Sequence, residues 1–416
     1  MTSASTRRIL LASLIGTSVE FYDFYIYATA AALVFGPLFF PADDPAVQLL
    51  ASYASFGLAF FARPLGAAVF GHFGDRLGRK STLVASLMLM GGSTVAIAFL
   101  PTYAQIGWVA PSLLCLLRFG QGLGLGGEWG GASLLAVENA PRGQENRWGM
   151  FPPLGAPVGF IAANGFFLLL GATLTDQQFR DWGWRVPFLA SAVLVLLGLW
   201  VRLKLTETPA FREAAAHDAL PKVPIAELFR LHLRATVAGT VGVVACFALF
   251  YLTTAFALSY GTTTLGHGRQ AFLALELGAI LFLAAGVIVS CTLADRFGAT
   301  AMLRWGFVGC VVSGLLMGTM LGSASLWVVF AWLALSLFAM GFAYGPLGGW
   351  LPSLFDAGVR YTGVSITFNL GGILGGALAP IAAQALAARG GLGLVGAYLV
   401  AAGVLSLGGL ALLKRR

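Results

Sequence analysis

Twelve apolar runs of about 20 residues follow one another along this 416-residue chain. A run of that length is what an α-helix needs to cross the ~30 Å hydrocarbon core of a bilayer. Only 10% of the residues are charged, which is too few to cover a soluble protein of this size. The sequence therefore predicts an all-α membrane protein with twelve transmembrane helices. The expected spans are residues 9–36, 50–72, 81–100, 106–134, 148–171, 185–203, 234–260, 270–293, 302–322, 325–353, 363–387 and 391–413.

The longest polar stretch between the runs, residues 204–233, divides the chain into six spans and six spans. It carries several prolines and basic residues. We therefore expect an N-terminal six-helix half at 1–203, a cytoplasmic central loop at 204–233 and a C-terminal six-helix half at 234–416.

The basic residues lie mostly in loops on one side of the expected membrane. With the N-terminus in the cytoplasm, nineteen of the 25 lysines and arginines fall inside and four outside, and Arg63 and Arg118 lie within spans. This bias follows the positive-inside rule, so we expect both termini in the cytoplasm. The net charge of +8 then reports topology rather than nucleic-acid binding. The first run follows Arg7 and Arg8 but lacks a clear small-residue cleavage site, so we expect an uncleaved span.

Ionisable residues interrupt several apolar runs, and a charge at such depth is costly. Asp23, Arg63 and Arg118 lie near the middle of spans 1, 2 and 4, and Glu20 lies one helical turn from Asp23. A midplane acid beside a midplane base suits a proton carrier, because the base favours the carboxylate whereas burial favours the neutral acid. We therefore expect Asp23 to carry the proton, with Arg118 as its partner and Glu20 in support.

The remaining polar residues within spans leave alternatives open. Glu20 and Glu128 either take part in function or form structural ion pairs. Arg63 either binds a substrate carboxylate or braces span 2. Glu276 lies near the outer end of span 8, where it can reach the headgroups, and we expect a structural rather than a functional role for it. Most aromatic residues of span 1 are expected to pack against other helices, although Tyr22 or Tyr25 can line a cavity. The substrate-binding candidates are Arg63, Tyr22, Tyr25, Glu128, Tyr344, Trp350 and Asn369.

Two loops at equivalent positions of the halves resemble each other. GHFGDRLGRK (71–80) joins spans 2 and 3, and CTLADRFGAT (291–300) joins spans 8 and 9. The shared Asp-Arg-x-Gly predicts two repeats around a midplane site. The glycines permit close helix approach and tight turns, and the acid can accept hydrogen bonds at a neighbouring helix N-terminus, such as that of span 11. We expect a cytoplasmic gate that contains Gly71, Asp75, Arg76, Gly78, Arg79, Lys80, Glu138, Asp295 and Arg296.

The 71–80 loop fits the G-x-x-x-D-R-x-G-R-[KR] motif of the major facilitator superfamily. VEFYDFYIYATAAALVFGPLFFP (19–41), RFGQGLGLGGEWGGASLLAVENAP (118–141) and WRVPFL (184–189) resemble its metabolite–proton symporter family, whose members carry shikimate, α-ketoglutarate, citrate, proline or betaine. The resemblance covers essentially the whole chain. It implies the major facilitator fold, with two pseudo-symmetric six-helix halves, and coupling through an acid in span 1 and an arginine in span 4, which Asp23 and Arg118 match.

Some features depart from that resemblance. The 291–300 loop is a degenerate copy of the first-half motif. PLGAPVGFIAANG in span 5 only loosely matches the Gly-Pro motif of drug–proton antiporters. The sequence also stops at residue 416 without the coiled-coil extension of some osmosensing relatives, which makes that role a less favoured expectation.

Together these features predict a secondary active transporter of the cytoplasmic (inner) membrane. We expect uptake of a small polar metabolite, an organic acid or a zwitterion, by proton symport and alternating access. A uniporter or antiporter of the same fold is one alternative, and a transport-dead membrane sensor is another.

An enzyme is not expected, because the four histidines lie in loops or at span ends. The four cysteines lie in apolar runs without metal-site or disulfide-framework spacing. We therefore expect no catalytic residues, metal or cofactor. The expected partners are a small-molecule substrate, H⁺ and the lipid bilayer, without nucleic acid, and the expected state is a monomer.

Overall fold

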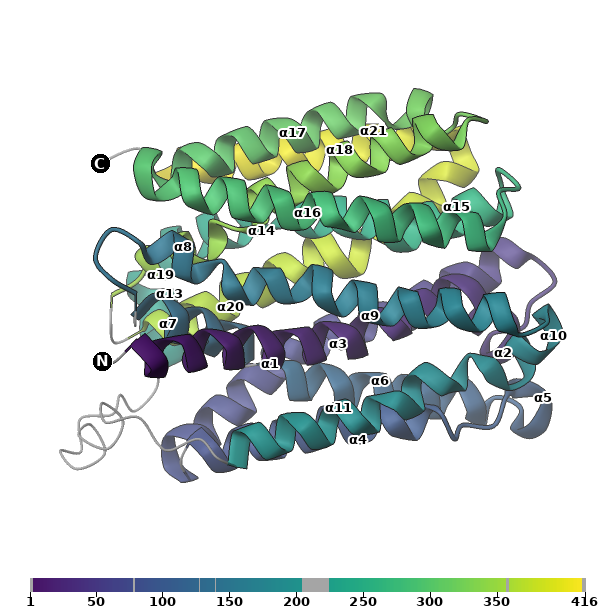
Figure 1. Ribbon diagram of the computed structural model, residues 1–416, viewed down its shortest axis with the longest axis horizontal. Coiled ribbons are helices and arrows are strands. Elements are labelled where there is room, and N and C mark those ends of the chain that lie inside the picture. Colours follow the sequence, from purple (N-terminus) through teal and green to yellow (C-terminus); the bar gives the residue numbers. More distant parts are fainter. Residues whose placement is uncertain are drawn as a thin grey trace.

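The computed structural model describes residues 3–77, 79–126, 128–138, 140–203, 224–356 and 359–413. In these residues the chain forms a bundle of long helices and no strand. The helices lie roughly along one direction, and α1 begins and α21 ends at the same end of the bundle (Figure 1). An even number of membrane crossings produces that arrangement.

The helices of the first half match the expected spans, with short helices in some of the connections. They are α1 (Ser3–Ala30), η1 (Ala31–Phe35), α2 (Gly36–Phe39), α3 (Pro45–Leu77), α4 (Arg79–Ile97), α5 (Tyr103–Ile106), α6 (Val109–Leu125), α7 (Glu128–Glu138), α8 (Glu145–Gly149), α9 (Phe151–Thr173), α10 (Asp176–Gln178), η2 (Phe179–Gly183) and α11 (Arg185–Leu203).

The second half begins, as far as it is described, with a short amphipathic helix within the expected central loop; residues 204–223 of that loop lie outside the described residues. Its helices are α13 (Pro224–Leu231), α14 (Leu233–Tyr251), η3 (Leu252–Phe256), α15 (Ala257–Thr263), α16 (Arg269–Phe297), α17 (Ala299–Met320), α18 (Leu326–Tyr344), α19 (Leu347–Ser353), α20 (Arg360–Gly372), η4 (Ile373–Ala377) and α21 (Leu378–Leu413).

Within the described residues, nine helices are long and apolar enough to cross a membrane, and a bent pair ending in α11 makes a tenth. A shorter apolar helix, Val84–Ile97, corresponds to span 3. The stretch Arg360–Leu413 contains a break at Gly390 and Gly391, where Gly391 has a φ of 68°. That break separates spans 11 and 12 where the sequence predicts it, so these segments correspond to all twelve expected spans.

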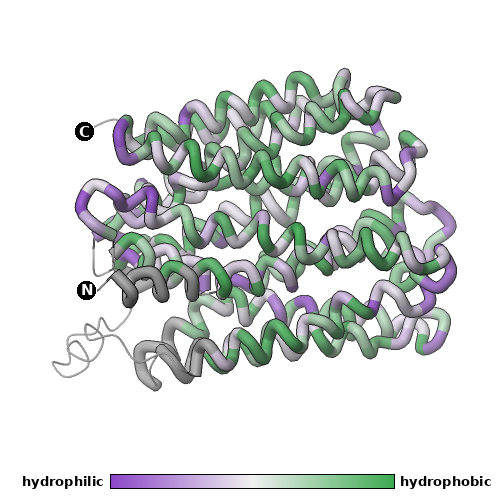
Figure 2. Tube along the Cα trace, in the orientation of Figure 1, coloured by the Kyte–Doolittle hydropathy of each residue, from purple (hydrophilic) through white to green (hydrophobic). Residues whose placement is uncertain are grey.

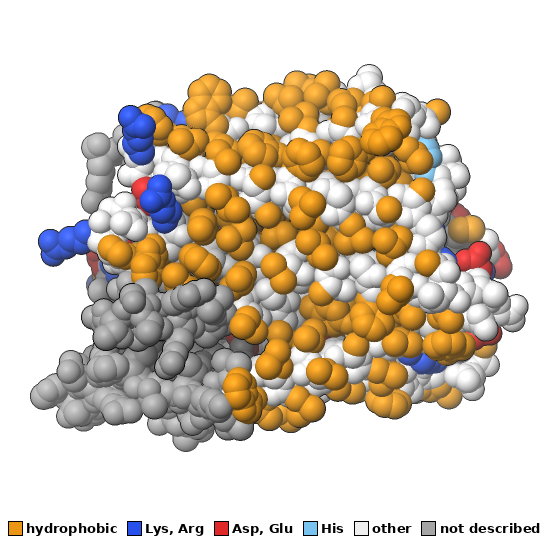
Figure 3. All heavy atoms as spheres, viewed as in Figure 1, with side chains coloured by type: hydrophobic (Ala, Val, Ile, Leu, Met, Phe, Trp, Pro, Cys, Tyr) orange, Lys and Arg blue, Asp and Glu red, His pale blue; other side chains and the backbone are white. Residues whose placement is uncertain are grey.

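The surface agrees with a lipid environment. Large apolar side chains such as Phe99, Trp305 and Trp327 are exposed. Hydrophobic atoms spread over the middle of the molecule, and blue arginine and lysine atoms gather mainly at the end where α1 begins (Figure 3). The backbone trace shows the same division, because most hydrophilic residues lie near the helix ends (Figure 2). A soluble monomer rarely exposes so continuous an apolar surface.

The two halves share irregularities at equivalent spans. Spans 1 and 7 are the most enclosed, with 78% and 94% of their most apolar windows buried. Each contains a π-helical turn, η1 or η3. Span 10 is interrupted at the α18–α19 junction, and in the equivalent span 4 the helix α6 ends at Leu125, with a turn at Gly126. An internal repeat predicts such matching breaks.

The most extensive contacts between the halves join α9 to α16, and α3 to the α20–η4 segment; α7 and α8 also contact second-half helices, among them α16, α19 and α20. Within the first half, glycines allow α3 and α6 to approach closely. A Cβ atom at Gly122 would lie 2.2 Å from the carbonyl oxygen of Ala59, and one at Gly66 would lie 2.0 Å from that of Leu123. This close approach holds Arg63 of α3 and Arg118 of α6 inside the bundle.

Candidate substrate and proton site

Asp23 lies in the second half of α1, near the middle of span 1, and the residue is 1% exposed. Its two carboxylate oxygens accept hydrogen bonds from different helices. Ser191 of α11 donates to Oδ1, and Thr94 of α4 donates to Oδ2 over 3.1 Å. The acid of span 1 is therefore held by hydroxyl groups of spans 3 and 6.

Arg118 connects to Asp23 through two intermediate side chains. Its Nη1 donates to Oε1 of Gln121 over 2.9 Å, and Nε2 of Gln121 donates to the Thr94 hydroxyl over 2.7 Å. That hydroxyl lies within hydrogen-bond distance of both Asp23 and the Met90 carbonyl oxygen. Among the described residues, no ion pair joins Asp23 to Arg118 directly, so the predicted pair becomes a chain of four side chains.

Both buried arginines pack against aromatic rings. The Arg118 guanidinium lies 4.3 Å from the ring centroid of Phe24 and 4.1 Å from that of Tyr27. The Arg63 guanidinium lies 4.4 Å from Phe24 and 4.7 Å from Phe60. Cation–π contacts stabilise a guanidinium away from water. Within the described part of the chain, Arg118 Nη2 and Arg63 Nε have no hydrogen-bond partner, which leaves donors for an incoming anion.

Two glutamates also lie near this group. Glu128 begins α7, is buried, and accepts a hydrogen bond from Ser86 over 2.9 Å; its charge acts on Asp23. Glu20 is only half-buried and lies within electrostatic range of Arg63. The first half therefore contributes three acids, Asp23, Glu20 and Glu128, and two bases, Arg63 and Arg118, to this group. The two bases pack on the rings of Phe24, Tyr27 and Phe60, which we call the aromatic layer.

The two tyrosine candidates of α1 have different surroundings. The Tyr22 hydroxyl donates to the Pro187 carbonyl oxygen over 2.8 Å, a contact that fixes α1 against α11. The Tyr25 ring lies 5.4 Å from Phe160 of α9 and 5.2 Å from Phe250 of α14, centroid to centroid. Tyr25 therefore lies where the two halves meet.

Two of the second-half candidates, Tyr344 and Asn369, contact span 4 of the first half. Trp129 of α7 donates to the Tyr344 hydroxyl over 3.1 Å and stacks on Phe368 with 3.6 Å between ring centroids. Asn369 donates to the Gly126 carbonyl oxygen over 2.8 Å, at the α6–α7 junction. Trp350 is buried and packs against Gly242. Tyr344 and Asn369 thus connect the halves in this arrangement.

The expected cytoplasmic gate is described only in part. The side chains of residues 71–83 and of Glu138 lie outside the described residues, which covers Gly71, Asp75, Arg76, Gly78, Arg79, Lys80 and Glu138. Asp295, the second-half counterpart of Asp75, accepts hydrogen bonds from the backbone N–H groups of Asn146 (3.0 Å) and Arg147 (3.2 Å) in the first turn of α8. Arg296 packs on Phe297. Asp295 therefore ties the second half to the first at the end where α1 begins (Figure 1).

At the opposite end of the bundle, an ion pair bridges the halves. Arg269 Nη2 lies 2.9 Å from Asp176 Oδ1, and the guanidinium lies 4.4 Å from the ring centroid of Phe179. Tyr53 of α3 also donates to the Ala255 carbonyl oxygen of η3 over 2.8 Å. Both ends of the interface are therefore bridged.

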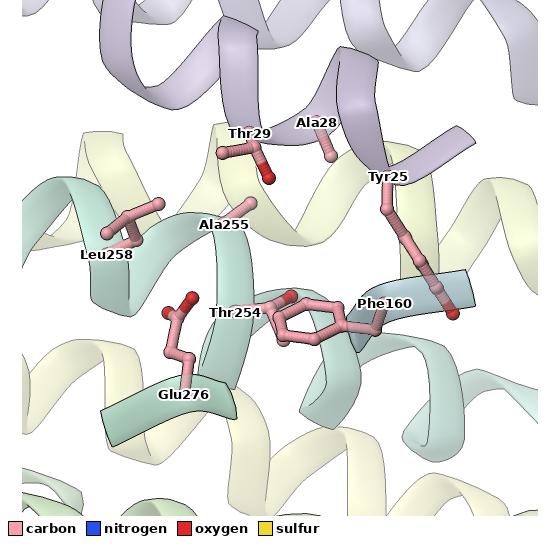
Figure 4. A pocket seen from close by; sticks show the side chains of 8 residues that line it. All are labelled: Tyr25, Ala28, Thr29, Phe160, Thr254, Ala255, Leu258 and Glu276. Carbon is pink, nitrogen blue, oxygen red and sulfur yellow. The ribbon is translucent and has the colours of Figure 1, made fainter. Parts of the chain in front are cut away.

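Between the bridged ends lies a cavity of ≈ 10 Å³, room for about one water molecule. Its lining comes from both halves and includes Tyr25, Thr29, Phe160, Thr254 and Glu276 (Figure 4). Within the described residues, the two bridged ends and this small cavity are the features expected of a closed state. The structure also corrects the expectation for Glu276, which is 1% exposed and faces this cavity rather than the headgroups. The face of α16 that bears Glu276 packs on the first half. The position of a residue along a span does not reveal the direction in which its side chain points.

Several of these residues escaped the sequence analysis. Thr94, Gln121 and Ser191 are neutral polar residues of a kind common in transmembrane helices. No local sequence pattern distinguishes them from the many polar residues whose side chains only form hydrogen bonds with the backbone of their own helix. Trp129 carried a weak signal, since it directly follows Glu128 inside an apolar span.

The profile of the sugar (and other) transporter family matches residues 9–219. The inner membrane metabolite transport protein YhjE of Escherichia coli is 50% identical over 408 residues, covering 97% of this chain and 93% of that protein. The shikimate transporter of Escherichia coli is 38% identical, covering 91% and 87%. The proline/betaine transporter of Salmonella typhimurium is 30% identical, covering 96% and 82%.

Among solved structures, a crystal structure of a D-xylose–proton symporter matches with a TM-score of 0.77 at 16% identity, covering 99% of this chain and 98% of that one. This likeness confirms the predicted twelve-helix fold. The relatives are transporters, which confirms that the chain is a metabolite transporter and not an enzyme.

Proposed function

Because the chain belongs to the sugar (and other) transporter family of the major facilitator superfamily, we propose that it takes up a small polar metabolite, an organic acid or a zwitterion, by proton symport. The observation that carries this proposal is the hydrogen-bonded chain from Arg118 through Gln121 and Thr94 to Asp23. This chain supports the proposal because it joins the Asp23 carboxylate, near the middle of span 1, to the guanidinium of Arg118.

The chain suggests how protonation couples to movement. Hydrogen bonds donated to a carboxylate favour its charged form, whereas burial without them favours the neutral acid. Asp23 receives its donors from α4 and α11, so a shift of either helix against α1 removes a donor. The acid then takes up a proton, and we propose that the loaded carrier changes orientation readily only in this neutral state.

The substrate is proposed to bind between the halves, close to the aromatic layer. Arg63 has an unpartnered Nε, which makes it the favoured contact for a substrate carboxylate. Tyr25, which lines the interface cavity, is favoured over Tyr22, whose hydroxyl already bonds to Pro187. Tyr344, Trp350 and Asn369 would complete the pocket when the hydrogen bonds that join Tyr344 and Asn369 to span 4 break.

The halves, 1–203 and 234–416, are proposed to rock around this site. In the orientation that the charge bias favours, both termini are cytoplasmic and the protein lies in the inner membrane. Asp295 with α8 would then close the cytoplasmic side, aided by the 71–80 loop, and Asp176 with Arg269 would close the outer side.

Asp23→Asn tests the proposal in proteoliposomes. The variant mimics the neutral acid, so it should retain substrate counterflow and lose accumulation driven by a pH gradient. Asp43→Asn, in an exposed loop, should leave both unchanged. Normal proton-driven accumulation in Asp23→Asn would exclude Asp23 as the coupling residue. Acidification of the vesicle interior with substrate entry distinguishes symport from antiport, and a constant pH would indicate a uniporter.

A further inference from the structure

Glu276 is a buried carboxylate that the coupling mechanism above does not use. It projects from α16 into the small cavity between the halves, and its Oε1 has no hydrogen-bond partner among the residues that the structure describes. Figure 4 shows the carboxylate pointing toward the space that also receives the hydroxyls of Thr29 and Thr254. Burying a carboxylate without a partner costs free energy, so a ligand that brings a positive charge into this cavity would stabilise it.

The two hydroxyls that share the cavity have already donated their protons elsewhere. The Thr29 hydroxyl donates to Asn164 Oδ1 over 2.6 Å, and the Thr254 hydroxyl donates to the Phe250 carbonyl oxygen over 2.8 Å. Each oxygen therefore presents lone pairs to the cavity. With the carboxylate they form a group of acceptors from α1, η3 and α16.

The rest of the lining also suits a positive charge. The rings of Tyr25 and Phe160 border the cavity, and their faces attract cations. Thr254 and Ala255 belong to the π-helical turn η3, a type of irregularity that is frequent at functional sites. The Glu276 charge acts on the Tyr53 phenol, which carries no compensating positive charge and donates its hydroxyl proton to the Ala255 carbonyl oxygen.

We propose that Glu276, Thr29 and Thr254 form a subsite for an ammonium group that bears N–H bonds. A primary ammonium has three N–H donors, which match the three acceptor oxygens, and it is about the size of the water molecule that the cavity admits. The aromatic rings favour an organic ammonium over a strongly hydrated metal ion. The inference rests on the proposed transport function and narrows its substrate to small zwitterions.

Matched ligands test the subsite by isothermal titration calorimetry on the purified full chain. L-alanine is compared with L-lactate, L-proline with tetrahydrofuran-2-carboxylate, and 4-aminobutyrate with 4-hydroxybutyrate. Each pair keeps the carboxylate and replaces the ammonium by oxygen. At least one ammonium member should bind about tenfold or more tightly than its counterpart, because charged hydrogen bonds discriminate strongly.

Three variants show whether that preference comes from this cavity. Glu276→Gln keeps the shape and removes the charge, so it should abolish the preference and leave binding of the oxygen counterpart nearly unchanged. Thr254→Val should weaken the preference and Thr254→Ser should retain it, a pair that also serves if Glu276→Gln fails to fold. Asp43→Asn, an exposed acid, should behave as wild type.

Equal binding within every pair, a preference that survives Glu276→Gln, or no binding by any of the six compounds would overturn the subsite. The proposed function fails in a different way. Proton-driven uptake of a carboxylate that lacks nitrogen would leave symport standing without the subsite, whereas ammonium-selective binding without proton dependence would leave the subsite standing without symport.

Discussion

Gln121 lies between Arg118 and Thr94, and Thr94 in turn contacts Asp23. The midplane acid and base are thus connected by hydrogen bonds rather than by an ion pair. Such a chain can be broken at one point by a small helix movement, whereas a buried ion pair would resist separation strongly. The interposed amide therefore suits a carrier that must separate these charges in each cycle.

Gln121→Met should disconnect the chain while nearly keeping the side-chain volume. We expect proton-driven accumulation to fall severalfold and the protein to lose about 1–3 kcal/mol of stability, because buried partners lose their hydrogen bonds. Accumulation and the thermal midpoint are measured on one preparation. Gln177→Met, on an exposed helix, is the control. Accumulation equal to wild type would show that the chain has no part in coupling.

Gly122→Ala should push α3 away from α6. The new Cβ would meet the Ala59 carbonyl oxygen at 2.2 Å, so backbone must move, at a cost of about 1–3 kcal/mol. Gly92→Ala is matched to it, because nothing lies within 4 Å of a Cβ there, and the change should be neutral or slightly stabilising. Thermal unfolding in detergent compares the two, and equal midpoints would contradict the packing of α3 on α6.

Asp295→Asn should loosen the contact with α8. The amide removes a charge from a helix N-terminus, worth about 1–2 kcal/mol with the hydrogen bonds, so the ratio of closed to inward-open molecules should fall roughly 5–30-fold. Spin-label distances across that end report the change. Asp356→Asn serves as control, because Asp356 pairs with His232 of the same half. Unchanged distances in Asp295→Asn would rule out a gate at α8.

Arg269→Gln should favour opening at the other end, but only slightly. Partly exposed ion pairs contribute about 0.2–1 kcal/mol, which is at most about a fivefold shift. Thiol labelling of Ala255→Cys in a background without the native cysteines measures access to the cavity. The double variant Asp176→Arg with Arg269→Asp should restore the wild-type rate, and failure to restore it would mean that charge pairing is not what closes this end.

A labelling experiment tests the membrane orientation. Cysteine at Gln144, in the exposed loop before α8, should be shielded from an impermeant thiol reagent in intact cells, and cysteine at Asp43 should react. The native Cys246, Cys291 and Cys310 are buried, and Cys115, which is half-buried, is replaced by alanine to keep the background low. Disruption of the cells should make both positions reactive. The reverse pattern would place the termini outside.

The helices and their approximate limits follow from the sequence alone, because the bilayer demands a fixed length of apolar residues for each crossing. The depth of a residue follows in the same way, since a helix rises 1.5 Å per residue. Asp23, Arg63 and Arg118 were therefore recognisable as central. The repeated Asp-Arg-x-Gly loops also pointed to Asp295, whose helix contact resembles the one expected for Asp75.

What surrounds each residue was decided by tertiary structure. Depth fixes the position along a helix axis, but the direction in which a side chain points depends on which helix packs there. The interposed Gln121, the donors Thr94 and Ser191, and the burial of Glu276 all depend on that direction. The length of each apolar run specifies one span independently of the others, whereas the rotation of each helix about its axis depends on how all the helices pack. The sequence could therefore reveal the buried charges but not their partners.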